Sequence, residues 1–361
     1  MPKILEPVHN SPSFHPLKKL MKMGTSPCFS FLSFKEAWGE FIIQNSAWAI
    51  SLASFVFLLT APMARADQQG GQRPAAYLQY GFGGPQIAMA GAAVGTRNDV
   101  ACGYWNPAGL SGLRGLQVEA QDILLPLNQQ LYFISVANGY QDKFFYGVTG
   151  AFYTPGGDLE ARTGPTLQPD SLFNDTEMTF LTSVAVRLSP RWSFGANFKI
   201  MTQNIGDYTG FGFGEDLGVQ YRFTKHTTFG FMAQDPYSVF TYTNSNSQIF
   251  PVTLKAGISE HDEKLSAKGN FDLEWSSDLG FRPRFGAEWR PAEVFAIRGG
   301  FWLGNLTSGA PGGSLTLNPT CGVGIIVPMG DSLLEFDYTL LPDRIISGGL
   351  LHQVSITGKF L

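Results

Sequence analysis

Charged residues are scarce in this 361-residue chain, in which Asp, Glu, Lys and Arg together make up 15%. Soluble domains average about 25%, so this chain has little charge with which to cover a surface that faces water. Glycine (42 residues) and phenylalanine (30 residues) are abundant instead. This pairing suits tightly turned, aromatic-rich strands better than helices. The composition therefore favours an all-β protein.

Long apolar runs are missing after residue 66, where no stretch approaches the roughly 18 apolar residues of a membrane-spanning helix. Cysteine is also rare: Cys102 and Cys321 are the only two in that part of the chain. They show neither C-x-x-C nor metal-ligand spacing. A disulfide between them is conceivable in an oxidising compartment, but two ordinary thiols are the favoured interpretation.

The first 66 residues have the three parts of a secretory signal. An apolar run at Ala47–Leu59 is followed by Ala64-Arg65-Ala66 and preceded by five lysines, Lys3, Lys18, Lys19, Lys22 and Lys35. A run of 13 residues is shorter than the roughly 20 that a membrane anchor needs. We therefore predict a leader over residues 1–66 with a cleavable signal peptide, and its unusual length suggests a true start at Met21 or Met23.

Removal of this leader makes the chain more acidic. It holds six of the 25 Lys and Arg and three of the 29 Asp and Glu, so 19 basic and 26 acidic residues remain, a net charge of −7. Nucleic acid is therefore not an expected partner.

Apolar and polar residues alternate with a period of two from about residue 115 to the end, as in half-buried strands. In Phe194–Met201, for example, Phe194, Ala196, Phe198 and Ile200 share one face, and Gly195, Asn197, Lys199 and Met201 share the other. Fourteen such strands are predicted, at 115–122, 129–138, 143–153, 176–189, 191–203, 213–223, 226–235, 250–258, 264–275, 282–289, 292–303, 319–328, 331–340 and 349–361.

The connections between these strands alternate between short turns and long loops, as in outer-membrane barrels. The alternative is a soluble β-sandwich. Many of the predicted strands reach 9 to 13 residues, which matches a tilted membrane span of about 9–11 better than the globular mode of about 5–6. Aromatic residues also lie near strand ends, where an interfacial girdle is expected: Tyr153, Trp192, Trp275, Trp289 and Phe360. The sequence therefore predicts an all-β fold, a transmembrane antiparallel β-barrel of about 14 strands over residues 115–361.

Residues 67–114 do not alternate and are predicted to form an N-terminal hatch in the barrel lumen. Their glycine cluster, Gly81-Phe82-Gly83-Gly84, is not a phosphate-binding loop, because no strand precedes it and the G-x-x-x-x-G-K-[ST] form is absent.

This segment carries a family resemblance. Gly83–Ala92 (GGPQIAMAGA) and Asn98–Leu110 (NDVACGYWNPAGL) look like the N-terminal hatch of FadL-type long-chain fatty-acid transporters, and most closely that of their PorV-like relatives. Arg284–Trp289, Ala296–Gly300, Phe336–Tyr338 and His352–Ser355 resemble the closing hairpins of the same family. The final strand also resembles the assembly signal of outer-membrane barrels, except that Leu361 follows the aromatic Phe360. The resemblance implies a fourteen-stranded barrel obstructed by its N-terminal segment.

The hatch motif consists of Tyr104, Trp105, Asn106, Pro107, Ala108, Gly109 and Leu110. Asn-Pro followed by Ala-Gly is turn chemistry. We therefore favour a role in folding the backbone inside the lumen over direct ligand contact.

Charges of both signs are predicted to face the lumen: Arg187, Lys199, Asp216, Arg222, Lys268, Asp272, Glu274, Glu288, Arg298, Glu335 and Asp337. Mixed charges pair across strands, whereas a ring of one sign filters ions, so a plugged conduit is favoured over an open porin. Asp272 and Glu274 fit a salt-bridge network better than acid–base catalysis. The histidines lack metal-ligand spacing and no Gly-x-Ser-x-Gly elbow occurs. No enzymatic activity, metal or cofactor is predicted.

The leading functional hypothesis is passive uptake of hydrophobic small molecules, such as long-chain fatty acids, across the bacterial outer membrane. Phe82, Ile87 and Met89 are the candidate apolar ligand contacts. The alternative is a PorV-like component or shuttle of protein secretion that does not transport. Expected partners are outer-membrane lipid, the hydrophobic ligand and the barrel-assembly machinery, with secretion-system proteins added by the alternative. A continuous apolar cavity would favour uptake, and a packed lumen with exposed loops would favour a binding role.

Overall fold

The computed structural model describes residues 74–361, except 163, 165–167, 244–246, 278–279, 305–315, 344–348 and 361. The predicted leader and its cleavage site lie outside the described residues. Among the described residues, no helix has the length and apolar character to cross a membrane.

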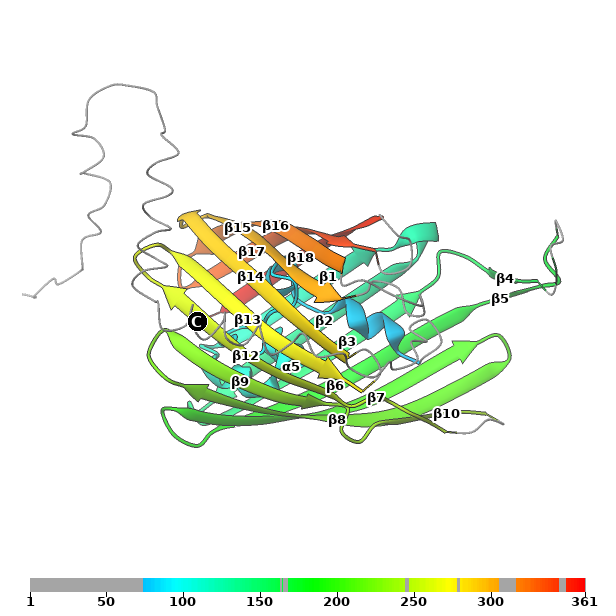
Figure 1. Ribbon diagram of the computed structural model, residues 1–361, viewed down its shortest axis with the longest axis horizontal. Helices are drawn as coiled ribbons and strands as arrows, with labels where there is room; N and C mark the ends of the chain where they lie inside the picture. Colours follow the sequence, from blue (N-terminus) through cyan, green and yellow to red (C-terminus); the bar gives the residue numbers. More distant parts are fainter. Residues whose placement is uncertain are drawn as a thin grey trace, which may run out of the picture. The chain divides into compact units, whose positions relative to one another are not determined.

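Fourteen antiparallel strands form a closed barrel (Figure 1). Each strand pairs with its neighbours along the chain, and pairing of β1 with β18 completes the wall. The strands are β1 (Leu116–Leu124), β2 (Gln130–Tyr140), β3 (Phe144–Thr154), β6 (Asp175–Arg187), β7 (Trp192–Ile205), β8 (Tyr208–Arg222), β9 (Thr227–Gln234), β12 (Thr253–Asp262), β13 (Ala267–Ser276), β14 (Gly280–Ala292), β15 (Phe295–Gly304), β16 (Thr316–Met329), β17 (Ser332–Pro342) and β18 (Leu350–Phe360).

The predicted number of strands is confirmed, and most boundaries agree within three residues. The largest difference is β8, which begins at Tyr208 rather than at residue 213. Glycines weaken a strand prediction, and Gly210 and Gly212 fall in this stretch. A Cβ at Gly210 would lie 2.2 Å from the ring of Phe240, which packs there from the neighbouring strand β10 (Val239–Tyr242). Packing from β10 therefore supports a strand that the composition disfavours.

The barrel has two unlike rims. We call one the short-turn end, because the turns after β2, β6, β8, β12, β14 and β16 lie there together with the end of β18. The opposite rim is the long-loop end. It carries the hairpin of β4 (Leu159–Ala161) and β5 (Ser171–Phe173), which extends beyond the wall (Figure 1). The strand β10, which pairs with the start of β8, and β11 (Gln248–Ile249) lie at this end as well.

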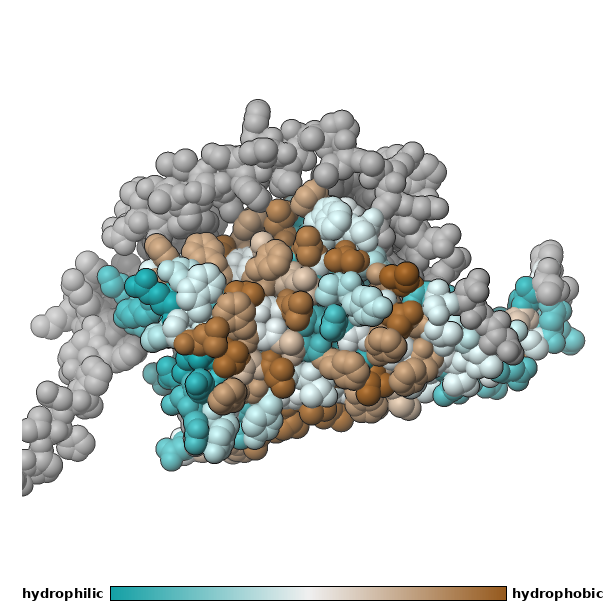
Figure 2. Space-filling view, turned by 90° about the horizontal axis from the view of Figure 1, so that it is seen from below, coloured by the Kyte–Doolittle hydropathy of each residue, from teal (hydrophilic) through white to brown (hydrophobic). Residues whose placement is uncertain are grey.

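Side chains alternate between the outer surface and the lumen along each barrel strand. Figure 2 shows apolar side chains spread over the outer surface of one face of the barrel. Ile134, Phe198 and Leu217 are among the exposed apolar residues of the wall. The predicted lumen-facing charges are buried or half-buried, as expected. Trp192, Trp289 and Phe360 are exposed near the short-turn end. The girdle prediction is wrong for Tyr153, which packs against the lumen core and stacks on Tyr77 with ring centroids 6.0 Å apart. The Tyr153 ring therefore packs inside the lumen and does not lie at the membrane interface.

Residues 74–114, which we call the N-terminal segment, contain the 3-10 helices η2 (Ala76–Tyr80) and η3 (Pro107–Gly112) and the short helices α4 (Gly84–Ala88) and α5 (Cys102–Trp105). A further turn, η4 (Pro126–Asn128), links β1 and β2. The segment is bonded to lumen-facing side chains around the wall: Gln121 of β1, Thr179 of β6, Asn197 of β7, Asp272 of β13 and Thr320 of β16.

Between residues 84 and 95 the segment follows the wall from strand to strand. It contacts β17 and β16 at Gly84 and Ala88, β15 and β14 at Met89, and β13 at Ala93. Lumen-facing glycines make the close approach possible. A Cβ at Gly286 would lie 2.5 Å from Met89, and a Cβ at Gly300 would lie 2.7 Å from the Met89 backbone.

The core lies between this segment and the wall. A larger apolar cluster joins η2, Phe82 and Trp105 to the long-loop half of the wall. A smaller cluster joins Cys102 and Leu110 to Phe145 near the short-turn end. Cys102 and Cys321 are both free thiols, the first buried and the second exposed on β16.

Candidate functional site

Tyr104 and Trp105, on α5, hold the beginning of the N-terminal segment in place. The Tyr104 hydroxyl donates a hydrogen bond to the Leu78 carbonyl, and Trp105 Nε1 donates to the Phe82 carbonyl at 2.6 Å. A Cβ at Gly81 would lie 2.6 Å from the Trp105 ring, so only glycine permits this approach. These two side chains thereby fix the loop that covers the lumen on the long-loop side.

Asn106 connects the same segment to the wall. Its side-chain amide nitrogen lies 2.9 Å from the carbonyl oxygen of Val94 and 3.2 Å from that of Val219, and its Oδ1 accepts from Ala108 N at 3.2 Å. Pro107 stands at the start of η3, where a missing N–H costs no helical hydrogen bond. The geometry of the motif is that of a backbone support, and Asn106–Leu110 line neither of the cavities described next.

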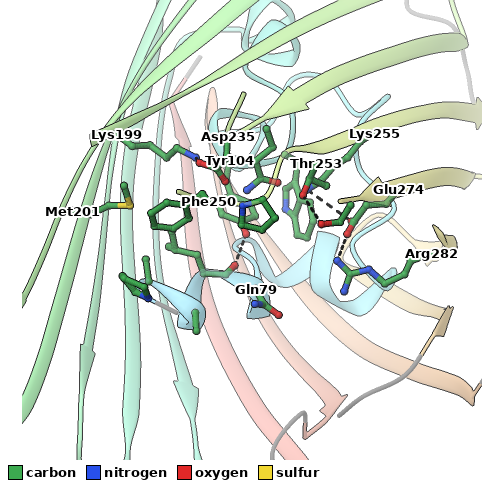
Figure 3. Close-up of a pocket in the computed structure, with 18 of the residues that line it drawn as sticks. Gln79, Tyr104, Lys199, Met201, Asp235, Phe250, Thr253, Lys255, Glu274 and Arg282 are labelled. Atoms are coloured by element: carbon green, nitrogen blue, oxygen red, sulfur yellow. Dashed lines mark hydrogen bonds and ion pairs between the residues drawn. The ribbon is translucent and has the colours of Figure 1, made fainter. Parts of the chain in front are cut away.

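A cavity of about 90 Å³ lies beside this support, towards the long-loop end (Figure 3). Its apolar lining includes Leu78 of η2, Trp105, Met201 of β7 and Phe250. Polar and charged side chains of β7, β9, β12, β13 and β14 also line it, as do further residues of the N-terminal segment and of the connection between β9 and β12. The cavity thus lies between the N-terminal segment and one side of the wall.

Positive charge exceeds negative charge around this cavity. Its described lining residues include four cations, Lys199, Lys255, Arg282 and Arg284, and two carboxylates, Asp235 and Glu274.

Lys199 is neutralised locally, because its ammonium contacts both Asp216, at 2.8 Å, and Asp235. Asp235 lies in the connection after β9, and its burial raises the pKa of its carboxyl, although nearby Lys199 opposes this shift. The excess of positive charge therefore lies on the side of the cavity formed by β12, β13 and β14.

On that other side three cations surround Glu274. Arg282 contacts one of its oxygens, Arg284 lies 3.0 Å from the other, and Lys255 Nζ lies 4.0 Å away. The Lys255 ammonium is also 5.4 Å from the centre of the Trp105 ring, within the range of a cation–π interaction. An anionic group in the cavity would meet Lys255, Arg282 and Arg284, which we call the cation cluster.

A second cavity, of about 20 Å³, lies on the other side of Trp105 and Arg284, which line both cavities together with Gln79. Ile87, Trp302 and Leu341 contribute to its lining. Arg284 donates to the Ala90 carbonyl at 2.8 Å and lies 5.8 Å from the centre of the Trp302 ring. Arg284 therefore connects the wall, the N-terminal segment and both cavities.

The three candidate ligand contacts have different surroundings. Phe82 is fully buried and its ring centroid is 5.4 Å from that of Phe133. Met89 is packed against the wall at Gly286 and Gly300. Only Ile87 lines one of the two cavities. Of the three candidate ligand contacts, Ile87 alone therefore borders one of the two cavities described here.

The short-turn half of the lumen is closed by an ion-pair cluster. Arg298 contacts Glu288 at 2.6 Å and also binds Glu335 and Asp337. Lys359 lies 3.4 Å from Glu335 and 3.7 Å from Asp99, which belongs to the N-terminal segment. The mixed inward charges predicted from the sequence pair across strands in this way.

The cation cluster was missed in the sequence, although the signal was present. Lys255 alternates with Leu254 and Ala256, and Arg282 and Arg284 alternate with Phe281 and Phe285. The same period-two rule that placed Glu274 in the lumen places all three cations there.

Known structures share this fold, whereas no family model and no curated protein matches the chain. The toluene transporter TodX of Pseudomonas putida is similar with a TM-score of 0.56 at 12% identity, covering 78% of this chain and 98% of that one. A FadL homologue of Pseudomonas aeruginosa gives 0.54 at 11%, covering 77% and 98%. The toluene transporter TbuX of Ralstonia pickettii gives 0.50 at 15%, covering 78% and 98%. At these identities the likeness establishes the barrel fold alone.

Proposed function

We propose that this barrel lies in the bacterial outer membrane and takes up hydrophobic small molecules passively. The apolar outer band supports the location, because a lipid-facing barrel needs such a surface. The fold shared with two toluene transporters and a FadL homologue supports the function. A water-filled channel would be a poor path for an apolar solute, and a plugged barrel with a cavity that is partly lined by apolar side chains suits it better.

We further propose that the ligand is an amphiphile with an anionic group, such as a long-chain fatty acid. The observation that carries this proposal is the cation cluster, which faces a cavity also lined by Leu78, Met201 and Phe250. A carboxylate at the cluster would gain charge-assisted hydrogen bonds from lysine and arginine. The alkyl chain would lie against the apolar side chains.

The cavity must widen to accept such a ligand. Its 90 Å³ compares with roughly 300–1,000 Å³ for typical ligand pockets. η2 and Phe250 line the cavity on the long-loop side, and they are held by apolar packing and, for η2, by neutral hydrogen bonds such as that of Tyr77 with Thr179. We therefore place the movement that admits the ligand at the long-loop end.

Binding measurements test the proposal. Lys255→Met should weaken binding of oleate to the purified barrel about tenfold, the effect of losing one charge-assisted hydrogen bond, and should leave binding of neutral toluene unchanged. Lys264→Met, in the exposed turn between β12 and β13, is the matched control. Equal loss for both ligands would contradict the anionic amphiphile. Absence of uptake of either compound into proteoliposomes would contradict transport itself.

A non-transporting role in protein secretion is the second candidate. Two observations favour it: the cavities are separated by Trp105 and Arg284, and the β4–β5 hairpin extends beyond the rim. Replacing residues 157–173 with a short Gly-Ser linker separates the candidates. Uptake through the barrel should persist without the hairpin. If uptake is absent in the intact protein and co-purifying secretion proteins are lost with the hairpin, the second candidate holds.

A further inference from the structure

Three arginines come together at the short-turn end of the lumen, on the side formed by β6, β7 and β8. Arg97 belongs to the N-terminal segment, Arg187 is the last residue of β6, and Arg222 is the last residue of β8. Arg187 and Arg97 meet at Ser111 of η3. Arg187 donates to its carbonyl oxygen, and Arg97 Nη2 donates to its hydroxyl oxygen at 3.1 Å. We call Arg97, Arg187 and Arg222 the arginine cluster.

Arg222 lies close enough to act on the charge of Arg97. Burial, and after it the positive charges of Arg222 and Arg187, lower the pKa of the Arg97 guanidinium to about 10. Arg97 is therefore still charged at neutral pH, and three like charges face one another. Repulsion between charges is stronger in a partly buried place than in bulk water. The arrangement is unfavourable unless an opposite charge joins it.

The protein does not supply that opposite charge. Among the described residues, no carboxylate forms an ion pair with the arginine cluster, and the Arg222 side chain makes no hydrogen bond. On the other side of the same end, Arg298 contacts the three carboxylates of Glu288, Glu335 and Asp337. The chain as a whole holds 29 acidic and 25 basic residues, so composition does not account for the positive patch.

The arginine cluster also has hydrogen-bond donors to spare and is open to solvent. Arg97 Nη1 and Arg187 Nε are buried without an acceptor. Unpaired buried atoms occur elsewhere in the lumen as well, but here they belong to cations without a counter-charge. All three side chains are only half-buried, and Asn98, next to Arg97, is exposed. A small solute can therefore reach the cluster from the short-turn end.

We propose that the arginine cluster binds a phosphate group, either free or on the head of a lipid. A phosphate monoester has three strong acceptor oxygens and a charge of about −1.5 to −2 near neutral pH, which suits three cations better than the single charge of a carboxylate. Guanidinium groups bind phosphate through paired, charge-assisted hydrogen bonds. The site shares no residue with the cation cluster and does not depend on the proposed uptake.

Thermal unfolding of the purified barrel in a neutral detergent tests the proposal, with inorganic phosphate exchanged for chloride at constant ionic strength. The unfolding temperature of the wild type should rise with phosphate, because a ligand that binds the folded state stabilises it. Arg222→Gln should weaken phosphate binding about tenfold, the effect of losing one charge-assisted hydrogen bond. This variant breaks no hydrogen bond of the Arg222 side chain. Lys264→Gln, in the exposed turn between β12 and β13 at the same end, is the matched control.

Native mass spectrometry distinguishes the two sources of phosphate. Retention of one phosphatidic acid from doped micelles by the wild type, but not by Arg222→Gln, would identify a lipid head, with phosphatidylcholine as the comparison lipid. Phosphate binding without lipid retention would identify a free anion. The proposal is overturned if the wild type binds neither probe, or if Arg222→Gln responds to both as the wild type does. Arg187→Gln should weaken binding too, and if it does not fold, Arg222→Gln decides.

Discussion

The two ends of the lumen are closed by different means. At the short-turn end the N-terminal segment is tied to the wall by charge: Asp99 approaches Lys359, which joins the cluster around Arg298. At the long-loop end the closure is mainly aromatic and apolar, with η2, Phe82 and Phe250 packed around a cavity. Ion pairs in a buried site demand fixed geometry, whereas apolar contacts tolerate repacking. The short-turn end is therefore the more firmly tied of the two, which fits the movement proposed above for the long-loop end.

The largest effect is expected from Arg298→Met at the anchored end. This change leaves Glu288, Glu335 and Asp337 without their shared cation, and breaking a buried ion pair costs about 3–5 kcal/mol. Urea unfolding followed by heat-modifiable gel migration would measure the loss. Lys255→Met removes one charge at the other end, where the nearest carboxylate oxygen is 4.0 Å away, and it should cost much less. Equal destabilisation by the two variants would contradict the difference between the charged contacts of the short-turn end and the apolar contacts of the long-loop end.

A smaller effect is expected at the boundary between segment and wall. In Gly300→Val the new side chain would meet the backbone of Met89 and Ala90, since even a Cβ would lie 2.7 and 2.9 Å from them. Overpacking of this kind costs about 1–3 kcal/mol and should expose the N-terminal segment to protease. Gly299→Val is the matched control, because the nearest atom to its Cβ is 3.8 Å away. Similar protease sensitivity in both variants would show that the wall glycines do not set the position of the segment.

A still smaller loss of stability is expected at Asn106, which links the N-terminal segment to β8 of the wall. Asn106→Ala removes the donor to Val94 and Val219 and the cap of η3, which should cost about 1–2 kcal/mol. Hydrogen exchange by mass spectrometry should then show faster exchange in residues 92–112 than in the wild type. Asn106→Asp serves as a second variant. If exchange in residues 92–112 is unchanged in both variants, the Asn106 side chain is not needed for the fold of the segment.

The smallest expected effect is on the reaction of the Cys102 thiol with maleimide. Burial raises the pKa of the Cys102 thiol to about 12, so the thiolate, which is the reactive form, is scarce at pH 8. In a Cys321→Ser background, maleimide at pH 8 should not label the folded barrel. Labelling should rise with pH as the thiolate forms and should rise at pH 8 when Arg298→Met releases the anchor. Rapid labelling of the folded parent at pH 8 would show that the short-turn end opens readily.

Much of the wall could be predicted from the sequence, because a period of two places each side chain on one face of a sheet without knowledge of its neighbours. That is why the strand number and the inward position of residues such as Lys199 and Asp337 agree with the structure. Tyr153 shows the limit of the rule: alternation alone does not say whether an aromatic ring near a strand end meets lipid or a plug.

The N-terminal segment could be predicted only in outline. Its position depends on contacts between residues far apart in sequence, such as Tyr77 with Thr179, 102 residues away, and Gly84 with Thr339, 255 residues away. No periodic pattern encodes such pairs. The cavity is missed for the same reason, because Phe82, Ile87 and Met89 are all apolar and only the packing decides that Ile87 borders a space.

The path of the N-terminal segment along the wall has a consequence for biogenesis. The segment precedes every strand in the chain, yet its partners include β16 and β17, which are among the last to be synthesised. Closure of the wall requires pairing of β1 with β18. Contacts over such separations form slowly. The N-terminal segment can therefore reach its final contacts only when the last strands of the wall are in place.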